Sequence, residues 1–243
     1  MPQHSQDDSL YLYQRRLPHW QPEGAIVFLT WRLYGSLPQE ALQRLEAERL
    51  LLLKQPKRSG ESPRQMALRH SKRLFALADV LLAQNRLPPQ WLAEDCLAQL
   101  IVDALFFHHQ RLYTLMAYVI MSNHVHVLLR PLEEEVQPGN SGLGESEDAQ
   151  TGKSAPRSTP LRRITRSLKG YTAREANRIL ARTGQTFWQD ESYDHWVRDE
   201  AELRRVLTYI EGDPVRAGLV VNIEDWRWSS AWARQQGRLS WPF

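Results

Sequence analysis

Two neighbouring segments constrain the fold of this chain most strongly: residues 111–121, RLYTLMAYVIM, and residues 124–130, HVHVLLR. Both segments are apolar and rich in β-branched or aromatic side chains, as buried strands are. Only Ser122 and Asn123 separate them, which is the length of a tight hairpin turn. We therefore predict two antiparallel strands joined by a short hairpin.

The second of these strands carries two histidines. Side chains at positions i and i+2 of a strand point to the same face, so His124 and His126 project together while Val125 and Val127 face the core. Two neutral imidazoles side by side form a ready pair of metal ligands. Two ordinary polar-face histidines are the alternative, but a polar pair is costly to place in a strand of otherwise apolar character.

The remaining chain predicts helices before and after this hairpin. An apolar strand is expected at 24–34, and 187–197 predicts a short aromatic-rich strand or loop. Helical periodicity appears at 39–54, 65–84, 92–110, 161–182 and 199–211. This order predicts an α+β fold, with helices packed on one face of a mostly antiparallel sheet.

One domain spanning 1–243 is expected, with three special segments. A helical insertion is predicted at 39–110, and 212–243 is predicted to be a C-terminal tail that contacts DNA. Residues 133–159 are rich in Gly, Ser, Pro and acids, a composition that predicts a disordered surface loop.

Composition indicates the cellular compartment of the protein. Hydrophobic residues make up 42% of the chain, which is enough for a core. The single cysteine, Cys96, allows no internal disulfide and indicates a reducing compartment. No stretch has the roughly 18–20 apolar residues of a membrane span, and Met1 to Ser9 lack the apolar core of a signal peptide. We expect a cytoplasmic protein without a membrane partner.

Basic residues concentrate after the 133–159 segment, although the formal net charge is only +3. Such a run fits a surface that follows nucleic-acid phosphates, and a solvated helix face is the alternative. The residues that we predict to contact DNA are Arg162, Arg163, Arg166, Lys169, Arg174, Arg198 and Arg216. Aromatic rings in the tail, Trp226, Trp228 and Trp232, either stack on bases or belong to the core.

Tyr171 lies on the predicted helix 161–182, within SLKGYTAREANRIL. A helical tyrosine usually packs with its hydroxyl at the surface. Glu175 is four residues further on and shares its helix face, so its carboxylate is a candidate oxygen ligand for a metal. The alternative for Glu175 is an exposed ion pair with Arg174 or Arg178.

Four blocks, MSNHVHVLL, SLKGYTAREAN, FWQDESYDHWVRD and DPVRAGLV, occur in this order and spacing. Together with the opening YQRRLPHWQPEGAIVFLTWRLYGSLP, they resemble the REP-associated tyrosine transposases. These belong to the IS200-like single-tyrosine transposases with the His-hydrophobic-His motif. The resemblance covers most of the chain outside roughly 133–159. This chain departs from the pattern at Ser122, where Pro is commoner, and at Gly212-Asp213, where relatives often carry Asn.

The resemblance implies a ferredoxin-like core with the histidines on a central strand and the tyrosine helix nearby. It implies His124 and His126 as metal ligands and Tyr171 as the nucleophile. Relatives take a third ligand from the tyrosine helix, which favours Glu175 here and leaves Asn177 as second choice. The implied cofactor is a divalent metal ion, Mg²⁺ or Mn²⁺, and imidazole ligands favour Mn²⁺.

The implied activity is cutting and joining of single-stranded DNA beside hairpins through a 5′-phosphotyrosine, by a monomer or homodimer. A relative that binds hairpin DNA without cutting it is the first alternative. A metal hydrolase with water as nucleophile and a structural nucleic-acid module with fortuitous histidines are the others.

Overall fold

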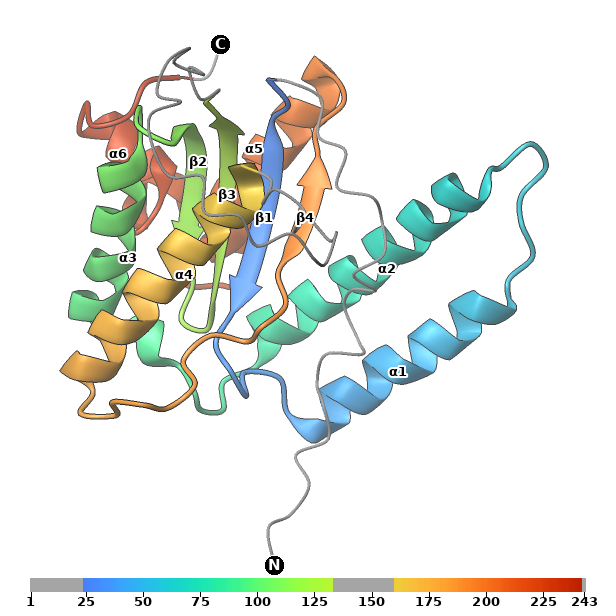
Figure 1. Ribbon diagram of the computed structural model, residues 1–243, viewed down its shortest axis with the longest axis horizontal. Coiled ribbons are helices and arrows are strands. Elements are labelled where there is room, and N and C mark those ends of the chain that lie inside the picture. Colours follow the sequence, from blue (N-terminus) through green and yellow to red (C-terminus); the bar gives the residue numbers. More distant parts are fainter. Residues whose placement is uncertain (1–23, 133–159, 242–243) are drawn as a thin grey trace, which may run out of the picture.

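The computed structural model describes residues 24–132 and 160–241, and it shows an α+β fold built on one antiparallel sheet (Figure 1). The strands are β1 (Val27–Arg32), β2 (Tyr113–Ile120), β3 (His124–Pro131) and β4 (Tyr193–Trp196). Their order across the sheet is β2-β3-β1-β4, and all neighbours are antiparallel. The predicted hairpin is confirmed as β2 and β3, and it lies beside β1 at the centre of the sheet.

Two helices connect the strands in the ferredoxin-like manner. The chain runs β1, α3 (Asp95–His108), β2, β3, α4 (Pro160–Ile179) and β4. Both helices pack on the same face of the sheet, where Val125 and Val127 share a buried cluster with Ile101 of α3 and with Ile164 and Leu168 of α4. The expected ferredoxin-like core is therefore present, with Val125 and Val127 turned toward its interior.

A further helix, α5 (Glu200–Arg216), covers the opposite face. Its Leu203, Leu207 and Ile210 pack against Phe28 of β1 and Leu128 of β3. We expected helices on one face of the sheet only. That expectation holds for α3 and α4 but not for α5. The second face is covered because β1 is buried along its whole length, and strands with two apolar faces need cover on both.

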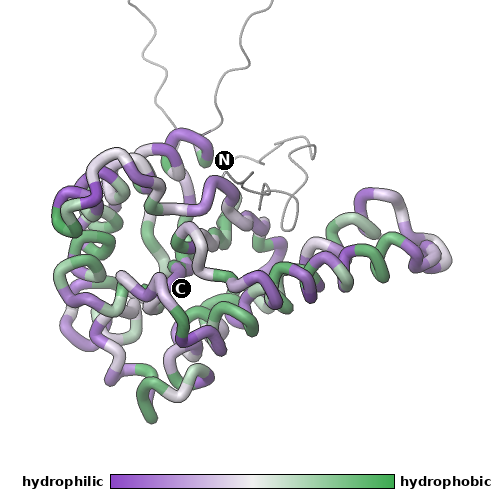
Figure 2. The backbone as a smooth tube through the Cα atoms, turned by 90° about the horizontal axis from the view of Figure 1, so that it is seen from below, coloured by the Kyte–Doolittle hydropathy of each residue, from purple (hydrophilic) through white to green (hydrophobic). Residues whose placement is uncertain are grey.

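A pair of antiparallel helices, α1 (Gln39–Lys54) and α2 (Pro63–Gln84), extends away from the sheet (Figures 1 and 2). We call residues 39–84 the arm. Its base has an apolar core, formed with Leu37 by buried side chains such as Leu45 and Leu82. The segment 39–110, predicted as one helical insertion, therefore comprises this arm, a short 3-10 turn η2 (Trp91–Ala93), and α3, which belongs to the sheet's own cover.

The C-terminal region packs against β2. It comprises η3 (Ile223–Asp225) and α6 (Ser230–Gln235) after the end of α5. Trp228 is buried, and the Trp226 indole donates a hydrogen bond to the Ile120 carbonyl at 3.0 Å. These two tryptophans therefore serve the core. The predicted disordered loop 133–159 lies outside the described residues. Among the helices of the described ranges, none has both the length and the apolar character needed to cross a membrane.

Candidate functional site

The two histidines of β3 face α5 and are completely buried. Their ring centroids lie 4.8 Å apart, so the prediction that they project together is confirmed. In the register with β1, Thr30 is opposite His126 and Arg32 is opposite His124. The pair therefore lies in the middle of the sheet, on the face opposite α3 and α4.

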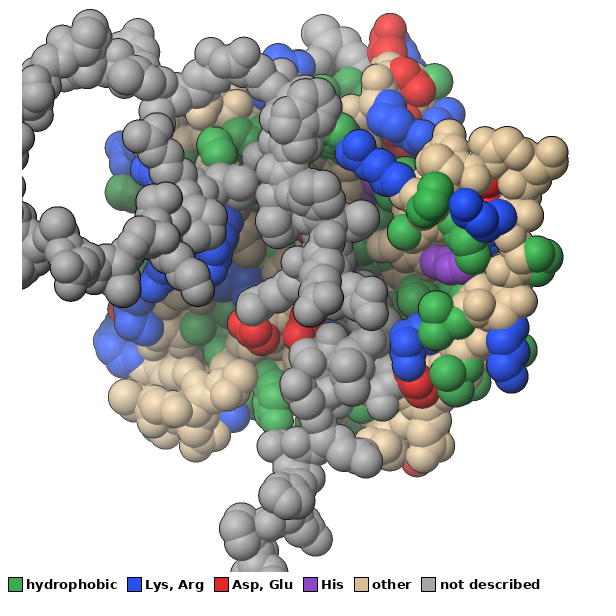
Figure 3. Space-filling view, turned by 45° about the vertical axis from the view of Figure 1, so that its right-hand side comes forward, with side chains coloured by type: hydrophobic (Ala, Val, Ile, Leu, Met, Phe, Trp, Pro, Cys, Tyr) green, Lys and Arg blue, Asp and Glu red, His purple; other side chains and the backbone are tan. Residues whose placement is uncertain are grey.

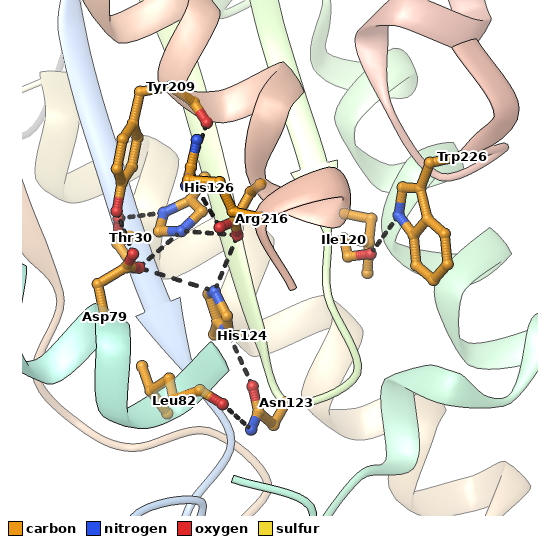
Figure 4. A network of polar contacts seen from close by, with 11 residues as sticks. Thr30, Asp79, Leu82, Ile120, Asn123, His124, His126, Tyr209, Arg216 and Trp226 are labelled. Atoms are coloured by element: carbon orange, nitrogen blue, oxygen red, sulfur yellow. Dashed lines mark hydrogen bonds and ion pairs between the residues drawn. The ribbon is translucent and has the colours of Figure 1, made fainter. Parts of the chain in front are cut away.

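Two carboxylates converge on the histidines, one from α2 and one from α5 (Figure 4). Asp79 Oδ1 lies 3.0 Å from His126 Nε2 and 3.8 Å from His124 Nε2. Asp213 Oδ2 lies 3.5 Å from each of the same nitrogens. Asp79 and Asp213 are 5% and 1% exposed, so both carboxylates are buried.

These four ligand atoms fit a metal ion. All four are buried, and within the described part of the chain none makes a hydrogen bond of acceptable geometry. Buried polar atoms are normally satisfied, so four such atoms that face one another are compatible with a bound cation. Ligand atoms of Asp79, His124 and His126 all lie within 4.8 Å of one another. Two imidazoles and two carboxylates suit a divalent ion such as Mn²⁺.

The outer nitrogens of both rings are held in place. His124 Nδ1 lies 2.6 Å from Asn123 Oδ1, and His126 Nδ1 lies 2.6 Å from Thr30 Oγ1. The Asn123 amide in turn donates to the Leu82 carbonyl at 3.0 Å, near the end of α2. Partners of this kind fix the orientation of each ring, with Nε2 turned toward the two carboxylates.

Electrostatics at the site follow from burial and from these pairings. Burial lowers the pKa of His126, but Asp79 and Asp213 outweigh burial and raise that pKa to about 9. Burial alone would raise the pKa of each aspartate, whereas attraction to the histidines holds the pKa of both below its usual value. Attraction between the His126 imidazole and the two carboxylates therefore favours the charged form of each group.

A tyrosine that we did not predict lies at this site. The Tyr209 hydroxyl donates a hydrogen bond to Asp79 Oδ2, and its ring centroid lies 5.7 Å from that of His126. Burial first, and then the two aspartates, raise the pKa of Tyr209 above its usual value. Tyr209 and Asp213 are four residues apart on α5, which brings both to the same helix face.

Arg216 completes the constellation (Figure 4). Its guanidinium donates to Asp213 Oδ1 and to the Tyr209 carbonyl, both at 2.9 Å, and lies 4.3 Å from the centre of the Tyr209 ring. The Arg216 side chain remains 44% exposed. This predicted DNA-contact residue therefore lies between the buried site and solvent.

The structure does not bring Tyr171 to the histidines. Tyr171 lies on α4, is 45% exposed, and belongs to a helix that packs on the Val125 and Val127 side of the sheet. Glu175 pairs with Arg178 at 3.0 Å, and the Asn177 amide donates to the Gln185 carbonyl at 2.6 Å. Among the described residues, the side chains that lie beside the histidines are instead those of Asp79, Asp213 and Tyr209.

The predicted basic residues fall into separate groups. Lys169 uses its ammonium to bind the carbonyls of Gln189 and Asp190 at 2.7 and 2.8 Å, and Arg198 pairs with Glu202 at 3.1 Å. Four arginines are exposed on α4, on the other side of the sheet from the histidines: Arg162, Arg163, Arg166 and Arg174. Their contact with DNA stays a prediction.

Two signals in the sequence pointed to the residues that we missed. Asp79 is a lone acid within the apolar run LADVLLA, where a charge is costly unless it is paired or binds a metal. Tyr209 and Asp213 stand at i and i+4 in a helical segment, and Asp213 opens the DPVRAGLV block. Both patterns identify buried polar groups, but neither reveals that they meet at the histidines.

Comparison with known proteins adds a likeness of fold. No family model and no curated protein matches the sequence. Among solved structures, the chain is similar to a REP-associated tyrosine transposase bound to a REP hairpin, with a TM-score of 0.45 and 16% identity over 93% of this chain and 87% of that one.

Proposed function

We propose that this chain is a metal-dependent enzyme that cuts and rejoins single-stranded DNA beside hairpins, with Tyr209 as its nucleophile. The observation that carries the proposal is the hydrogen bond from Tyr209 to Asp79, whose second oxygen faces both histidine Nε2 atoms. The choice of DNA as substrate rests on the sequence resemblance to tyrosine transposases.

The cofactor of the proposed enzyme is a divalent ion, Mg²⁺ or Mn²⁺. His124, His126, Asp79 and Asp213 would hold it through the four orphaned atoms. When bound, such an ion supplies Lewis acidity toward an oxygen of a DNA phosphate. The two carboxylates match its double positive charge, and the nitrogen ligands favour Mn²⁺ over Mg²⁺.

The chemical step uses groups of this chain. Asp79 Oδ2 orients the Tyr209 hydroxyl through their hydrogen bond, and Tyr209 Oη attacks phosphorus while its proton is released to solvent. The bond between phosphorus and the 3′ oxygen breaks, which leaves a 5′-phosphotyrosine and a 3′ alkoxide that takes up a proton. Attack by the 3′-hydroxyl of another strand reverses these bond changes, so joining needs no external energy source.

The step also requires a group that holds a phosphate near Tyr209, and Arg216 is suited to this role. Its guanidinium orients Asp213 and stacks on the Tyr209 ring, while almost half of the side chain faces solvent. Guanidinium groups bind phosphate oxygens in a bidentate manner. We therefore assign Arg216 to the approaching backbone phosphate.

A covalent-adduct assay tests the proposal. Labelled hairpin oligonucleotides with single-stranded flanks would be incubated with the protein in Mn²⁺ or EDTA, and SDS-resistant adducts counted. We expect an adduct that requires metal and disappears in Tyr209→Phe, while Tyr171→Phe keeps it. Binding without an adduct would favour the non-catalytic relative, and cleavage that survives Tyr209→Phe would favour water as nucleophile.

A further inference from the structure

The arm carries a concentration of positive charge that the proposed chemistry does not use. Residues 39–84 contain nine Lys and Arg against five Asp and Glu, a formal charge of +4, whereas the whole chain has +3. Figure 3 shows Lys and Arg side chains spread over this projecting part of the molecule. Helix α4 is the other basic region, with six Lys and Arg against one Glu, and the acidic residues of 133–159 offset much of its charge in the total.

Some of these cations form ion pairs within the arm or at its base. Arg49 pairs with Glu46, Arg69 with Glu61, and Arg73 with Glu48, at 2.7 to 2.9 Å. Lys72 pairs at 3.0 Å with Glu202 of α5. The Arg73 pair joins α1 to α2, and the Lys72 pair joins the arm to α5.

The tip is different. Lys54 ends α1, Arg64 is in the first turn of α2, and Lys57 lies in the connection between them. All three side chains are exposed, and in 24–132 and 160–241 they form no ion pair. Three exposed cations at the end of the arm give it a positive surface of the kind that attracts phosphates.

The same helix connects this tip to the metal site. Arg64 and Asp79 are both on α2, fifteen residues apart, which corresponds to about 22 Å along the helix axis. That length matches roughly six to seven base pairs of duplex DNA at about 3.4 Å each. A duplex that begins near Asp79 and follows the arm would therefore bring its backbone to the tip.

Side-chain chemistry favours a duplex over a single strand here. Proteins hold single strands by stacking bases on aromatic rings. No Phe, Tyr or Trp occurs between Tyr34 and Phe75, so the arm offers charge but no stacking surface before its base. We propose that the tip of the arm, Lys54, Lys57 and Arg64, binds the backbone of the double-stranded stem of the DNA hairpin whose single-stranded flank reaches the metal site. This inference rests on the proposed function for the identity of the DNA.

Stem length gives the sharpest test. The variant K54Q/K57Q/R64Q would be compared with wild type for binding, in EDTA, to hairpins with stems of about four and about ten base pairs and the same flank. Three lost phosphate contacts should reduce the slope of log affinity against log salt by about 2.7 for the long stem. Between about 50 and 200 mM salt, wild-type affinity should then fall about 40-fold more than that of the variant. The short stem should show no difference.

The variant R163Q/R166Q/R174Q removes the same charge from α4 and is the matched comparison. Loss of long-stem affinity in this variant with none in the arm variant would overturn the proposal. An equal loss for both stem lengths would also overturn it, because the contacts would not depend on the stem. Leu50, Leu51 and Leu53 are exposed near the tip, so sedimentation must be run as well. Altered self-association with unaltered DNA affinity would assign the arm to a second copy of the chain.

Binding in EDTA separates this inference from the enzymatic proposal. Arm-dependent binding without any covalent adduct would retain the inference and reject the nuclease. A covalent adduct whose yield is unchanged in the arm variant and for both stem lengths would support the nuclease and reject the inference.

Discussion

The hydroxyl of Tyr209 donates a hydrogen bond to the carboxylate of Asp79, which joins α5 to α2 across 130 residues of sequence. The same carboxylate turns its other oxygen to His124 and His126. The tyrosine, the histidines of the sheet and the base of the arm therefore form one connected polar site.

Removing the Asp79 charge should weaken metal binding. Asp79→Asn keeps the shape of the side chain but loses an anionic ligand, so Mn²⁺ affinity measured by calorimetry should fall by at least about tenfold. Asp103→Asn, on the exposed side of α3, is the matched control and should bind Mn²⁺ as wild type does. Equal affinities in all three proteins would mean that Asp79 is no ligand.

The hydroxyl of Thr30 should matter without touching the ion. Thr30→Val removes the group that lies 2.6 Å from His126 Nδ1 and preserves the volume of the side chain. Because partners of this kind orient the ring, Mn²⁺ affinity should drop by about 10- to 100-fold. Thr165→Val, which removes a hydroxyl that bonds only to the Leu161 carbonyl of its own helix, should leave affinity unchanged.

Phe75 links packing of the arm to the site. Its ring stacks on Tyr193 with centroids 3.9 Å apart, and it lies one helical turn before Asp79. Phe75→Ala should lower the free energy of unfolding by about 2 kcal/mol, less than for a fully buried ring, and should also weaken Mn²⁺ binding. Normal metal affinity in a destabilised protein would show that the arm base does not hold Asp79 in place.

Glu202 should make stability depend on pH. Burial alone would raise its pKa, but bonds from Arg198, His195 and Lys72 hold the pKa well below the usual value of 4.5. A carboxyl with a lowered pKa stabilises the fold above its unfolded-state pKa, and this contribution is lost as pH falls toward the folded-state value.

Glu202→Gln should therefore cost about 2 kcal/mol of unfolding free energy near pH 7. The difference in free energy of unfolding between wild type and Glu202→Gln, measured by urea titration, should shrink below about pH 4.5. A gap that stays constant down to about pH 3.5 would contradict the assigned role.

The histidine pair was predictable because strand alternation is strict. Val125 and Val127 had to face a core, so His124 and His126 had to share the other face. The α+β layout was also predictable from the order of the elements along the chain, whereas the ferredoxin-like topology was implied by the resemblance to the tyrosine transposases.

Which tyrosine lies beside the histidines was not predictable in the same way. Tyr171 and Tyr209 both lie on amphipathic helices, and periodicity does not say which face of a sheet a helix covers. As a crossover helix from β3 to β4, α4 packs on the face of Val125, away from the histidines. Asp79 was harder still, because its partners lie 45 and 47 residues further along the chain, on a strand that only tertiary folding brings near α2.

Mapping the covalent bond tests the central claim most directly. Wild-type protein would be incubated with hairpin DNA and Mn²⁺, digested with nuclease and trypsin, and analysed for peptides that carry a nucleotide. Tyr209 falls in peptide 206–216 and Tyr171 in peptide 170–174, so the two are separated by mass. The account predicts a nucleotide on peptide 206–216. A nucleotide on peptide 170–174 would contradict it.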